Sequence, residues 1–337
     1  RRVSAATAYL HPARTRRNLT VRTEVVVNRL LLRSDRVYGV EYIQFGQTHQ
    51  VTADQEVILC AGAINSPQVL MLSGIGDEST LTSMGIKVVQ HLPAVGKYLQ
   101  DHLDIYVCHK SDSDLTKTPA LKWHNRVRAG LQWFTTKRGD AATNHFEALG
   151  YLRSQYASDS PDLLAWFCPL LVSPDGKAMG HAHGYFLMLM HQRPQSRGEV
   201  TLRSPDPMVG PTIHARLLTN DHDKCVLRDA VRVGRELLRQ PAFEPYRGTE
   251  IAPGSGKISD EQIDAYVRDA AKSTRHPSCT CRMGMDEDES VVDSQGRVHG
   301  VRAIRVVDAS IMPSIVSGAL NATTIMLAEK IADSVLG

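Results

Sequence analysis

The chain has 337 residues, of which 42% are hydrophobic and 22% are charged, and this composition is ordinary for a globular protein. The length is enough for two domains, because a single domain typically holds about 100 to 200 residues. The formal net charge of +3 is too small for this length to indicate a nucleic-acid partner. No apolar run approaches the roughly 20 residues that a membrane-spanning helix needs, so a transmembrane segment is not predicted.

The first predicted elements are strands. Segments rich in β-branched residues follow one another at short spacing and predict one small sheet: 19–27, 37–43, and 51 with 56–60. A helix is expected next, with Ser66 as its N-cap and Pro67 at its first position. Its body would be residues 68–72, and Gly74 would end it.

The sequence Gly74-Ile-Gly76 invites comparison with a phosphate-binding glycine loop. Two features argue against that interpretation. The third glycine of such a loop is replaced by Ser79, and the two glycines follow a helix instead of a strand. We therefore predict no phosphate loop at this point.

After about residue 102 the composition shifts toward Trp, Phe and Met. Strands are predicted at residues 146–153, 185–191 and 199–203. Helices are expected at residues 221–239 and 263–271, the second opened by a capping box that runs from Ser259 to Gln262. This pattern predicts a second domain built on an antiparallel sheet.

The last quarter of the chain carries the residues best suited to chemistry. His276 stands in His276-Pro-Ser-Cys-Thr-Cys281, and a short strand ends in Asp308-Ala309. Histidine is suited to act as a base near neutral pH, because its ordinary pKa is about 6.5. The alternative is a structural loop histidine. Asn321 opens an apolar helix, where Asn is a preferred N-cap.

His276, Cys279 and Cys281 also invite interpretation as metal ligands. A zinc site usually has four ligands, with a second spaced pair. No such second pair is visible in the sequence, so we predict no metal site.

These C-terminal segments resemble the signatures of the glucose-methanol-choline (GMC) oxidoreductases. Residues 62–76 resemble the internal signature of the same family, and the likeness extends over the whole chain. It is strongest to the family members that oxidise choline, through His276-Pro-Ser-Cys-Thr-Cys281, Asn144-His-Phe-Glu147 and Tyr246-Arg-Gly-Thr-Glu250. One departure is Tyr98, which stands where the family usually has Asn.

The resemblance implies a fold of α/β plus α+β class. Residues 1–104 and 275–337 would form an FAD-binding, Rossmann-like domain, and residues 105–274 an inserted substrate domain with an antiparallel sheet. The FAD domain would be incomplete, because the phosphate loop of the family lies upstream of residue 1.

The resemblance also implies a function, the FAD-dependent oxidation of a primary alcohol, choline to betaine aldehyde, with hydride transfer to flavin N5. His276 would take the hydroxyl proton and Asn321 would orient the oxygen. The residues expected to contact FAD are Val25, Ala61, Gly62, Asp308, Ala309 and Thr323. Asp308 has an equal alternative as a strand-end cap.

A quaternary ammonium ion offers no hydrogen-bond donor, so it needs a carboxylate or an aromatic cage. Glu147 is the predicted carboxylate, and Phe146, Tyr151 and Trp166 are candidate walls. Each of these aromatic residues, taken alone, has an ordinary core residue as its alternative.

The expected partners are the alcohol and a quinone or other electron acceptor, with peripheral membrane association and a mitochondrial location, in betaine biosynthesis. Two alternatives stay open. One is a GMC dehydrogenase for glucose or another alcohol. The other is an inactive fragment or binding module, since the N-terminal FAD site of the family is outside this sequence.

Overall fold

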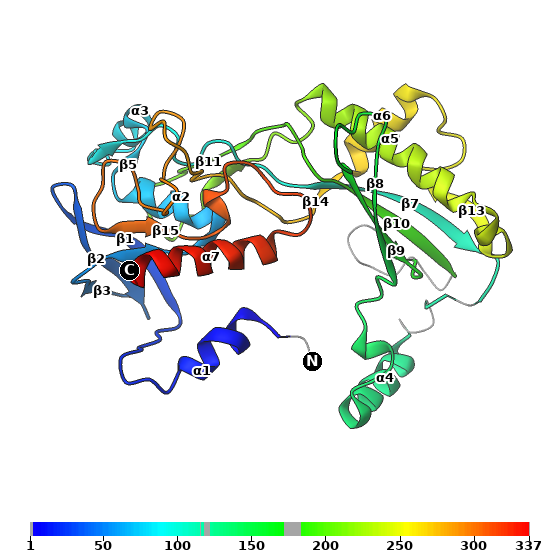
Figure 1. Ribbon diagram of the computed structural model, residues 1–337, viewed down its shortest axis with the longest axis horizontal. Helices are drawn as coiled ribbons and strands as arrows, with labels where there is room; N and C mark the ends of the chain where they lie inside the picture. Colours follow the sequence, from blue (N-terminus) through cyan, green and yellow to red (C-terminus); the bar gives the residue numbers. More distant parts are fainter. Residues whose placement is uncertain (1–2, 115, 118–121, 172–182, 337) are drawn as a thin grey trace.

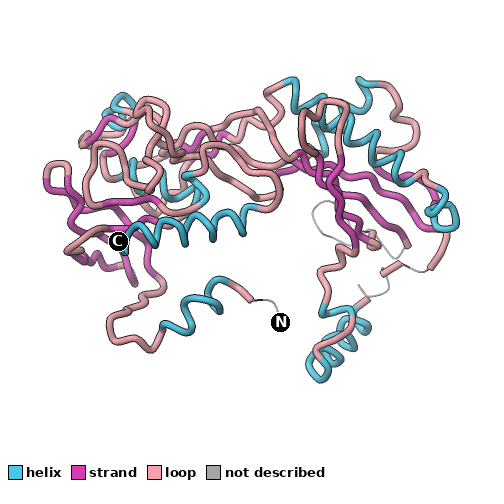
Figure 2. The backbone as a smooth tube through the Cα atoms, viewed as in Figure 1, coloured by secondary structure: helices cyan, strands magenta, loops and turns pink. Residues whose placement is uncertain are grey.

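The computed structural model describes residues 3–114, 116–117, 122–171 and 183–336. It has mixed α/β and α+β architecture in two parts (Figure 1). One part joins the early strands to the C-terminal segments around α2. The other is built on an antiparallel sheet, and Figure 2 shows how loops connect the two.

The early strands form a three-stranded antiparallel meander of β1 (Val25–Arg33), β2 (Arg36–Gln44) and β3 (Gln47–Thr52). The prediction that the first strand starts at residue 19 is wrong by six residues. Glu24 has φ of 57°, in the left-handed region, which interrupts extended backbone immediately before Val25.

Part of the third predicted segment, residues 56–60, forms a separate strand, β4 (Val57–Leu59), which does not join this meander. It pairs in parallel with β15 (Ile304–Val306), with Ile304 opposite Val57. The pairing places residues 60–62 next to residues 307–309. A local pattern cannot reveal it, because the partner lies in the last tenth of the chain.

Helix α2 (Gly62–Leu72) begins earlier than predicted, so Ser66 and Pro67 lie inside it and not at its start. Pro67 cannot donate to the carbonyl of Ala63, the bond that an interior helical residue normally makes. The hydroxyl of Thr280 donates to that carbonyl at 2.6 Å and compensates for the loss. The helix ends at Leu72, and Gly74 follows with φ of 83°, in agreement with the predicted stop.

The second part is a six-stranded sheet in the order β13-β7-β10-β9-β8, with β14 paired to β7, and all of its pairings are antiparallel. The strands are β7 (Leu103–Ser111), β8 (Ala148–Leu152), β9 (Leu163–Cys168), β10 (Gly184–His191), β13 (Arg247–Ala252) and β14 (Lys272–Ser273). The predicted antiparallel sheet is therefore confirmed.

The strand predicted at residues 199–203 lies elsewhere. It forms as β11 (Glu199–Thr201), pairs with β12 (Thr212–His214), and binds through Val200 N to the carbonyl of Gly96 at 2.7 Å. Val200 is therefore hydrogen-bonded to the loop that precedes β7 and is not part of the six-stranded sheet.

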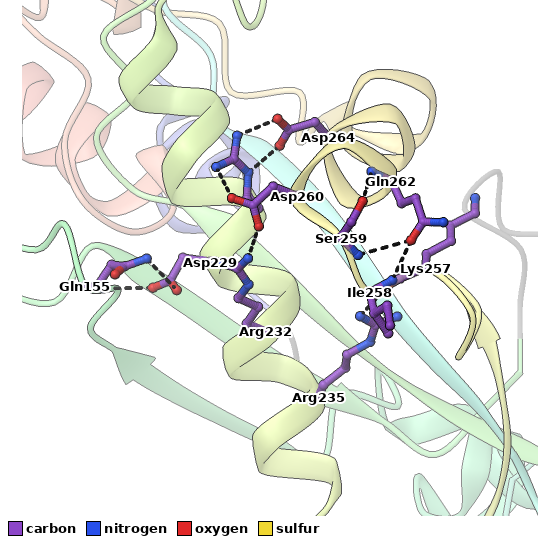
Figure 3. A network of polar contacts seen from close by, with 11 residues as sticks. Gln155, Asp229, Arg232, Arg235, Lys257, Ile258, Ser259, Asp260, Gln262 and Asp264 are labelled. Atoms are coloured by element: carbon purple, nitrogen blue, oxygen red, sulfur yellow. Dashed lines mark hydrogen bonds and ion pairs between the residues drawn. The ribbon is translucent and has the colours of Figure 1, made fainter.

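Two helices, α5 (Asp221–Leu238) and α6 (Asp260–Ala270), cover one face of the sheet. Gly234 allows this close approach, because a Cβ there would lie 2.8 Å from Leu189 Cδ1. Arg228 of α5 donates to Asp264 at 2.6 Å and to Asp260 at 2.9 Å, and these carboxylates appear in Figure 3. The predicted Ser259–Gln262 capping box opens α6.

The remaining elements lie around these two parts. They are an N-terminal arm (Ala6–Leu10 and α1, His11–Ala13), β5 (Ile75–Gly76), α3 (Glu78–Ser83), β6 (Gln90–His91), α4 (Trp123–Thr136), three 3₁₀ turns (Asp140–Ala142, Pro241–Tyr246, Ala309–Ile311) and α7 (Leu320–Leu336). All six cysteines are free. Among the described residues, no helix is both long and apolar enough to cross a bilayer, and no cluster of three metal-binding side chains occurs.

Candidate active site

His276 lies in the loop after β14, at the end of β7 that carries His102. Its backbone N donates to Asp101 Oδ1 at 2.8 Å, which fixes the loop against the start of β7. The two imidazole rings meet edge to face, with centroids 5.3 Å apart and Nδ1 atoms 3.0 Å apart. The predicted base is thus one half of a histidine pair.

The hydrogen bonds of this pair determine which nitrogen of His276 is free. His102 Nε2 lies 3.1 Å from the carbonyl oxygen of Gln192, and a carbonyl only accepts, so this nitrogen carries the proton. Neutral His102 then has a bare Nδ1, which accepts from the Nδ1–H of His276. His276 is left with a bare Nε2, the form that a proton acceptor requires.

The pKa values favour these neutral forms at pH 7. Burial, and then the neighbouring His276, lower the pKa of His102 to about 4. Burial also lowers the pKa of His276, while the charge of Asp101 opposes that shift. Because His276 is only half-buried, its ring remains reachable from the solvent side.

Two glutamine side chains hold the loop that leads into α7. Gln100 Oε1 accepts from Ile315 N at 3.0 Å, and Gln192 Oε1 accepts from Gly318 N at 2.5 Å. The start of α7 is thereby anchored to the segments that carry the histidine pair. Asn321 is the second residue of α7 and is exposed, so the prediction that it caps the helix is wrong, since the helix already begins at Leu320.

The carboxyl ends of β4 and β15 form the junction expected to hold part of FAD. Asp308 Oδ2 accepts from Gly62 N at 2.9 Å and from Ser66 Oγ at 2.5 Å, while Oδ1 accepts from Ser310 N at 2.8 Å. Asp308 therefore acts as a cap that ties β15 to the start of α2. A Cβ on Gly62 would meet no atom within 4 Å, so the backbone there is open to a ligand.

This junction unites four of the predicted FAD residues, Ala61, Gly62, Asp308 and Ala309, whereas Val25 begins β1 and Thr323 lies in the first turn of α7. Small residues at the ends of parallel strands are the usual place where a dinucleotide meets the backbone. The residues present therefore fit FAD.

The face of the six-stranded sheet opposite α5 carries an unusual mixture of side chains. Strand alternation places Asp104 and Tyr106 on it, together with Phe186, Met188 and Trp166 from the neighbouring strands. We call these five residues the open face.

The predicted aromatic residues extend this surface. Phe146 lies 5.9 Å from Trp166 and 6.4 Å from Phe186, measured between ring centroids. Tyr151 pairs with Leu164 on the adjacent strand, and a Cβ on Gly318 would lie 3.3 Å from its hydroxyl. The open face thus reaches the loop that leads into α7.

Asp104 is the buried carboxylate of this surface, with 5% of its area exposed. Its Oδ1 has no hydrogen-bond partner among the described residues, and Oδ2 receives only a long bond of 3.4 Å from the Tyr106 hydroxyl. Burial raises its pKa to about 6. Asp104 pairs with Lys272 of β14, four residues before His276, so it stands at the histidine end of the sheet.

Glu147, the predicted carboxylate, occupies the other end. It is exposed, and it lies near Cys168, the last residue of β9, whose thiol pKa is raised to about 11 by burial and, to a smaller extent, by the charge of Glu147. Sequence reasoning therefore selected one carboxylate near this surface and missed another. The available signal was the acidic Asp104 at the start of β7, between Leu103 and Ile105 and directly after Gln100-Asp101-His102.

The sequence profiles of known families match both ends of the chain. Two profiles described as GMC oxidoreductase cover residues 1–104 and 194–328. The chain belongs to the GMC oxidoreductase family. Its predicted resemblance is thereby confirmed.

The curated relatives include oxygen-dependent choline dehydrogenases of Yersinia pseudotuberculosis and Chromohalobacter salexigens, each 44% identical to this chain over its whole length. The chain spans about 60% of the length of either relative. Both organisms are bacteria, as is Acinetobacter baumannii, the source of a third relative. The expected mitochondrial location is therefore wrong.

Solved structures of the same fold agree with the sequence comparison. Formate oxidase of Aspergillus oryzae superposes with a TM-score of 0.90 at 25% identity, over 95% of this chain and 61% of the other. Pyridoxine 4-oxidase, whose source is printed as Mesorbium loti, gives 0.86 at 29% identity, over 99% and 62%. A Chaetomium thermophilum neighbour is described as FAD-dependent, with a TM-score of 0.85 at 25% identity, over 96% and 63%. The descriptions of the formate oxidase and of the Chaetomium thermophilum neighbour both name FAD.

Proposed function

We propose that this chain supplies the base and the substrate site of an FAD-dependent dehydrogenase that oxidises choline to betaine aldehyde, a step of betaine biosynthesis. The observation that carries this proposal is the bare Nε2 of His276 at the same end of the sheet as the buried carboxylate Asp104. A base and an anionic site are what a cationic alcohol requires. The 44% identity to choline dehydrogenases supports the same substrate.

FAD, when bound, supplies the acceptor for the hydride that leaves the alcohol carbon. His276 Nε2 takes the hydroxyl proton as the C–O bond becomes a carbonyl, so one proton and one hydride leave together. The imidazolium that forms keeps its Nδ1–H bond to His102 and is stabilised by the charge of Asp101. Asn321, in the first turn of α7, orients the substrate oxygen.

The trimethylammonium group is proposed to lie against the open face. Asp104 contributes Oδ1, which has no hydrogen-bond partner among the described residues, and Tyr106 and Trp166 offer ring faces that attract a cation. Phe146 and Tyr151 form the outer wall. Glu147, at the exposed end, remains the competing carboxylate, and substitutions distinguish the two.

For FAD, we propose backbone contacts at Ala61, Gly62 and Ala309, with Asp308 holding these segments in place. Val25 and Thr323 are proposed contacts on β1 and α7. Reduction of the flavin creates negative charge, which the partial positive charge at the start of α7 would stabilise.

Two electron acceptors stay in competition. The name of the relatives, oxygen-dependent choline dehydrogenase, favours dioxygen, and a membrane quinone is the alternative. Anaerobic reduction followed by stopped-flow mixing with either acceptor separates them, because only the true acceptor reoxidises the flavin at the rate of turnover. Peripheral association with a membrane is also proposed.

The test of the function is spectroscopic. The purified flavoprotein is made anaerobic, and its absorbance near the visible flavin bands is followed while choline is added. Bleaching by choline, and not by glucose or by uncharged alcohols of the same size, supports the proposal. Bleaching by the neutral alcohols with equal efficiency favours the broader alcohol dehydrogenase, and bound flavin that no alcohol reduces overturns both.

A further inference from the structure

Residues 191–196 run from the end of β10 toward β11 and contact the active site. The carbonyl oxygen of Gln192 faces His102 Nε2 at 3.1 Å, and this contact decides which nitrogen of that ring carries the proton. The side chain of Gln192 accepts from Gly318 N, in the loop that leads into α7. We call residues 191–196 the bridging segment, because they contact both the partner of the proposed base and that loop.

Two further contacts connect the bridging segment to the loop before α7. Arg193 Nε donates to Ser317 Oγ at 3.0 Å. The carbonyl oxygen of Pro194 accepts from Gln100 Nε2 at 2.7 Å. The same glutamine accepts from Ile315 N through its Oε1 at 3.0 Å. A displacement of the bridging segment would therefore displace the loop and the first turn of α7 as well.

A buried carboxylate outside the active site holds the bridging segment in place. Asp223 lies in the first turn of α5 and has no exposed area. Its Oδ1 accepts from Gln195 N at 2.8 Å and lies 3.2 Å from His191 Nε2. Its Oδ2 accepts from Ser196 N at 2.8 Å. Because a carboxylate only accepts, His191 Nε2 carries a proton, and three donors of one short segment meet a single side chain.

Asp223 is ionised at neutral pH. Burial by itself would raise its pKa, but hydrogen bonds from His191 and from the backbone of Gln195 and Ser196 outweigh that effect and lower the pKa to about 2. A buried charge costs stability unless its hydrogen bonds are well formed. The start of α5 does not need this carboxylate, because Asn220 is the N-cap of that helix. The partners of Asp223 lie in the bridging segment instead.

We propose that Asp223 is a positioning residue, which keeps the bridging segment where Gln192 fixes the proton of His102 and where the loop sets the start of α7. This role rests on the proposed function, in which His276 is the base. Without the carbonyl of Gln192 at its Nε2, His102 can carry its proton on Nδ1. The proton of neutral His276 then moves to Nε2, and the base is lost. Asp223 therefore acts on the chemical step through two other residues, without contact with the substrate.

The first experiment compares two buried carboxylates of α5. D223N keeps the shape of the side chain but turns an amide donor toward one of the three donors that face it. D229N is the matched control, because Asp229 is also buried and accepts from Gln155 N at 2.8 Å, away from the bridging segment (Figure 3). Parent and variants, as purified flavoproteins, are reduced anaerobically over a range of choline concentrations. Rates are expressed per bound flavin.

The limiting rate of flavin reduction in D223N should fall about 10- to 100-fold, because small misplacements of catalytic groups have effects of this size. The choline concentration at half the limiting rate should stay within about threefold of the parent value. D229N should be reduced at the parent rate. A merely structural role of Asp223 would instead lower the flavin content and the unfolding temperature, and would leave the rate per bound flavin unchanged.

A second measurement needs no substrate. The Gly318 amide donates to Gln192, so peptides that cover residues 315–318 should exchange amide hydrogen about tenfold faster in D223N than in the parent or in D229N. Peptides of α6 should exchange as in the parent, which excludes a general loosening of the fold. A parent protein that choline does not reduce overturns the proposed substrate, and the exchange difference still decides whether Asp223 holds the loop.

Substitutions at His191 test the same contact from the other side, and they decide the question even if D223N binds no flavin. H191Q keeps an amide donor near the place of Nε2, whereas H191L has a similar volume and no donor. H191L should lower the limiting rate per bound flavin about tenfold, and H191Q should retain most of the parent rate. Parent-like rates and parent-like exchange in both D223N and H191L overturn the positioning role, as does an equal loss of rate in D229N.

Discussion

The two faces of the six-stranded sheet have opposite character. On the covered face, Leu103, Ile105, Leu187 and Leu189 pack with Val226, Ala230 and Val231 of α5, and all are buried. On the open face, Asp104 and Tyr106 alternate with those leucine and isoleucine residues along the same strand, β7. One strand thus serves an apolar core with one set of side chains and a polar site with the other.

The two faces differ in how completely the packing and hydrogen-bonding contacts of their side chains are satisfied. Side chains on the covered face have their contacts completed by α5 and α6. Asp104 keeps an oxygen without a partner among the described residues, and burial raises its pKa to about 6. A buried charge without a partner costs stability, and such a cost is typical of a binding site. The covered face should therefore govern folding and the open face should govern binding.

The largest effect is expected at His276, at the same end of the sheet as Asp104. H276Q keeps a polar side chain of similar size but removes the proton acceptor, so kcat should fall about 10²- to 10⁴-fold. Anaerobic flavin reduction by choline measures it directly. The flavin spectrum and the unfolding temperature should be unchanged, and a variant that retains more than a tenth of the parent rate would refute the role of His276 as the base.

The pH dependence of the same reaction tests the protonation argument. The pKa of His276 is lowered, so Nε2 is unprotonated at neutral pH, and the rate should fall only as the pH drops through that lowered value. In H102N, the side-chain amide of the asparagine can only imperfectly replace His102 Nδ1 as the hydrogen-bond partner of His276. The acid limb of the rate should shift in that variant, whereas an unchanged profile would contradict the tautomer assignment.

A substitution on the covered face should change the stability of the protein and not its KM for choline. Leu189 has no exposed area and contacts α5, so L189A should lower the free energy of unfolding by about 2 to 5 kcal/mol. Urea unfolding followed by circular dichroism measures the change. The KM for choline should stay within about twofold in the folded fraction. A large change in KM would contradict the claim that the covered face governs folding and the open face governs binding.

Asp104 should show the reverse behaviour. D104N keeps the shape and removes the charge, so KM for choline should rise about tenfold or more while the KM for an uncharged alcohol of similar size stays level. Steady-state assays with both substrates measure this. Equal changes for the two alcohols would show that Asp104 does not bind the cation.

The same residue links stability to pH. Its folded pKa of about 6 exceeds the ordinary value of 3.8, so between these values the folded state binds more protons than the unfolded state. Stability is therefore greater at acidic pH and is lost as the pH rises through about 6, by about 3 kcal/mol. D104N should remove that loss and be more stable than the parent at pH 8. Affinity for choline should fall as the pH drops below about 6.

The sequence predicted the elements that depend on local patterns of residues. In the second part, local patterns predicted strands β8 and β10, helix α5 and the capping box at Ser259, whereas strands β7, β9, β13 and β14 were not predicted. The role of His276 as a base was predicted from the resemblance of its motif to the family, and it stays a prediction. Long-range pairings could not be predicted from the sequence. Strand β4 pairs with β15, and Ser66 donates a hydrogen bond to Asp308 instead of capping α2.

The predicted site was also incomplete, because long-range contacts decide which side chains meet there. Asp104 and Glu147 are both acidic residues near strands, and no local pattern distinguishes a carboxylate at the histidine end from one at the exposed end. The distinction depends on sheet register, which pairs Asp104 with Lys272 and Met190. His102 was overlooked because its importance comes from a contact with a residue 174 positions away.

The smallest effect is expected at Glu147, and it decides between the two carboxylates. Because Glu147 is exposed, water and salt screen its charge, and a surface charge of this kind contributes only about 0 to 1 kcal/mol. E147Q should therefore change the KM for choline by no more than about threefold and should leave stability unaltered. The assay is the one used for D104N, run at low and at high salt. If E147Q instead raised KM as much as D104N, the cation would span both ends of the open face. If only E147Q raised it, the exposed end would be the site, and the buried carboxylate would belong to the fold and not to binding.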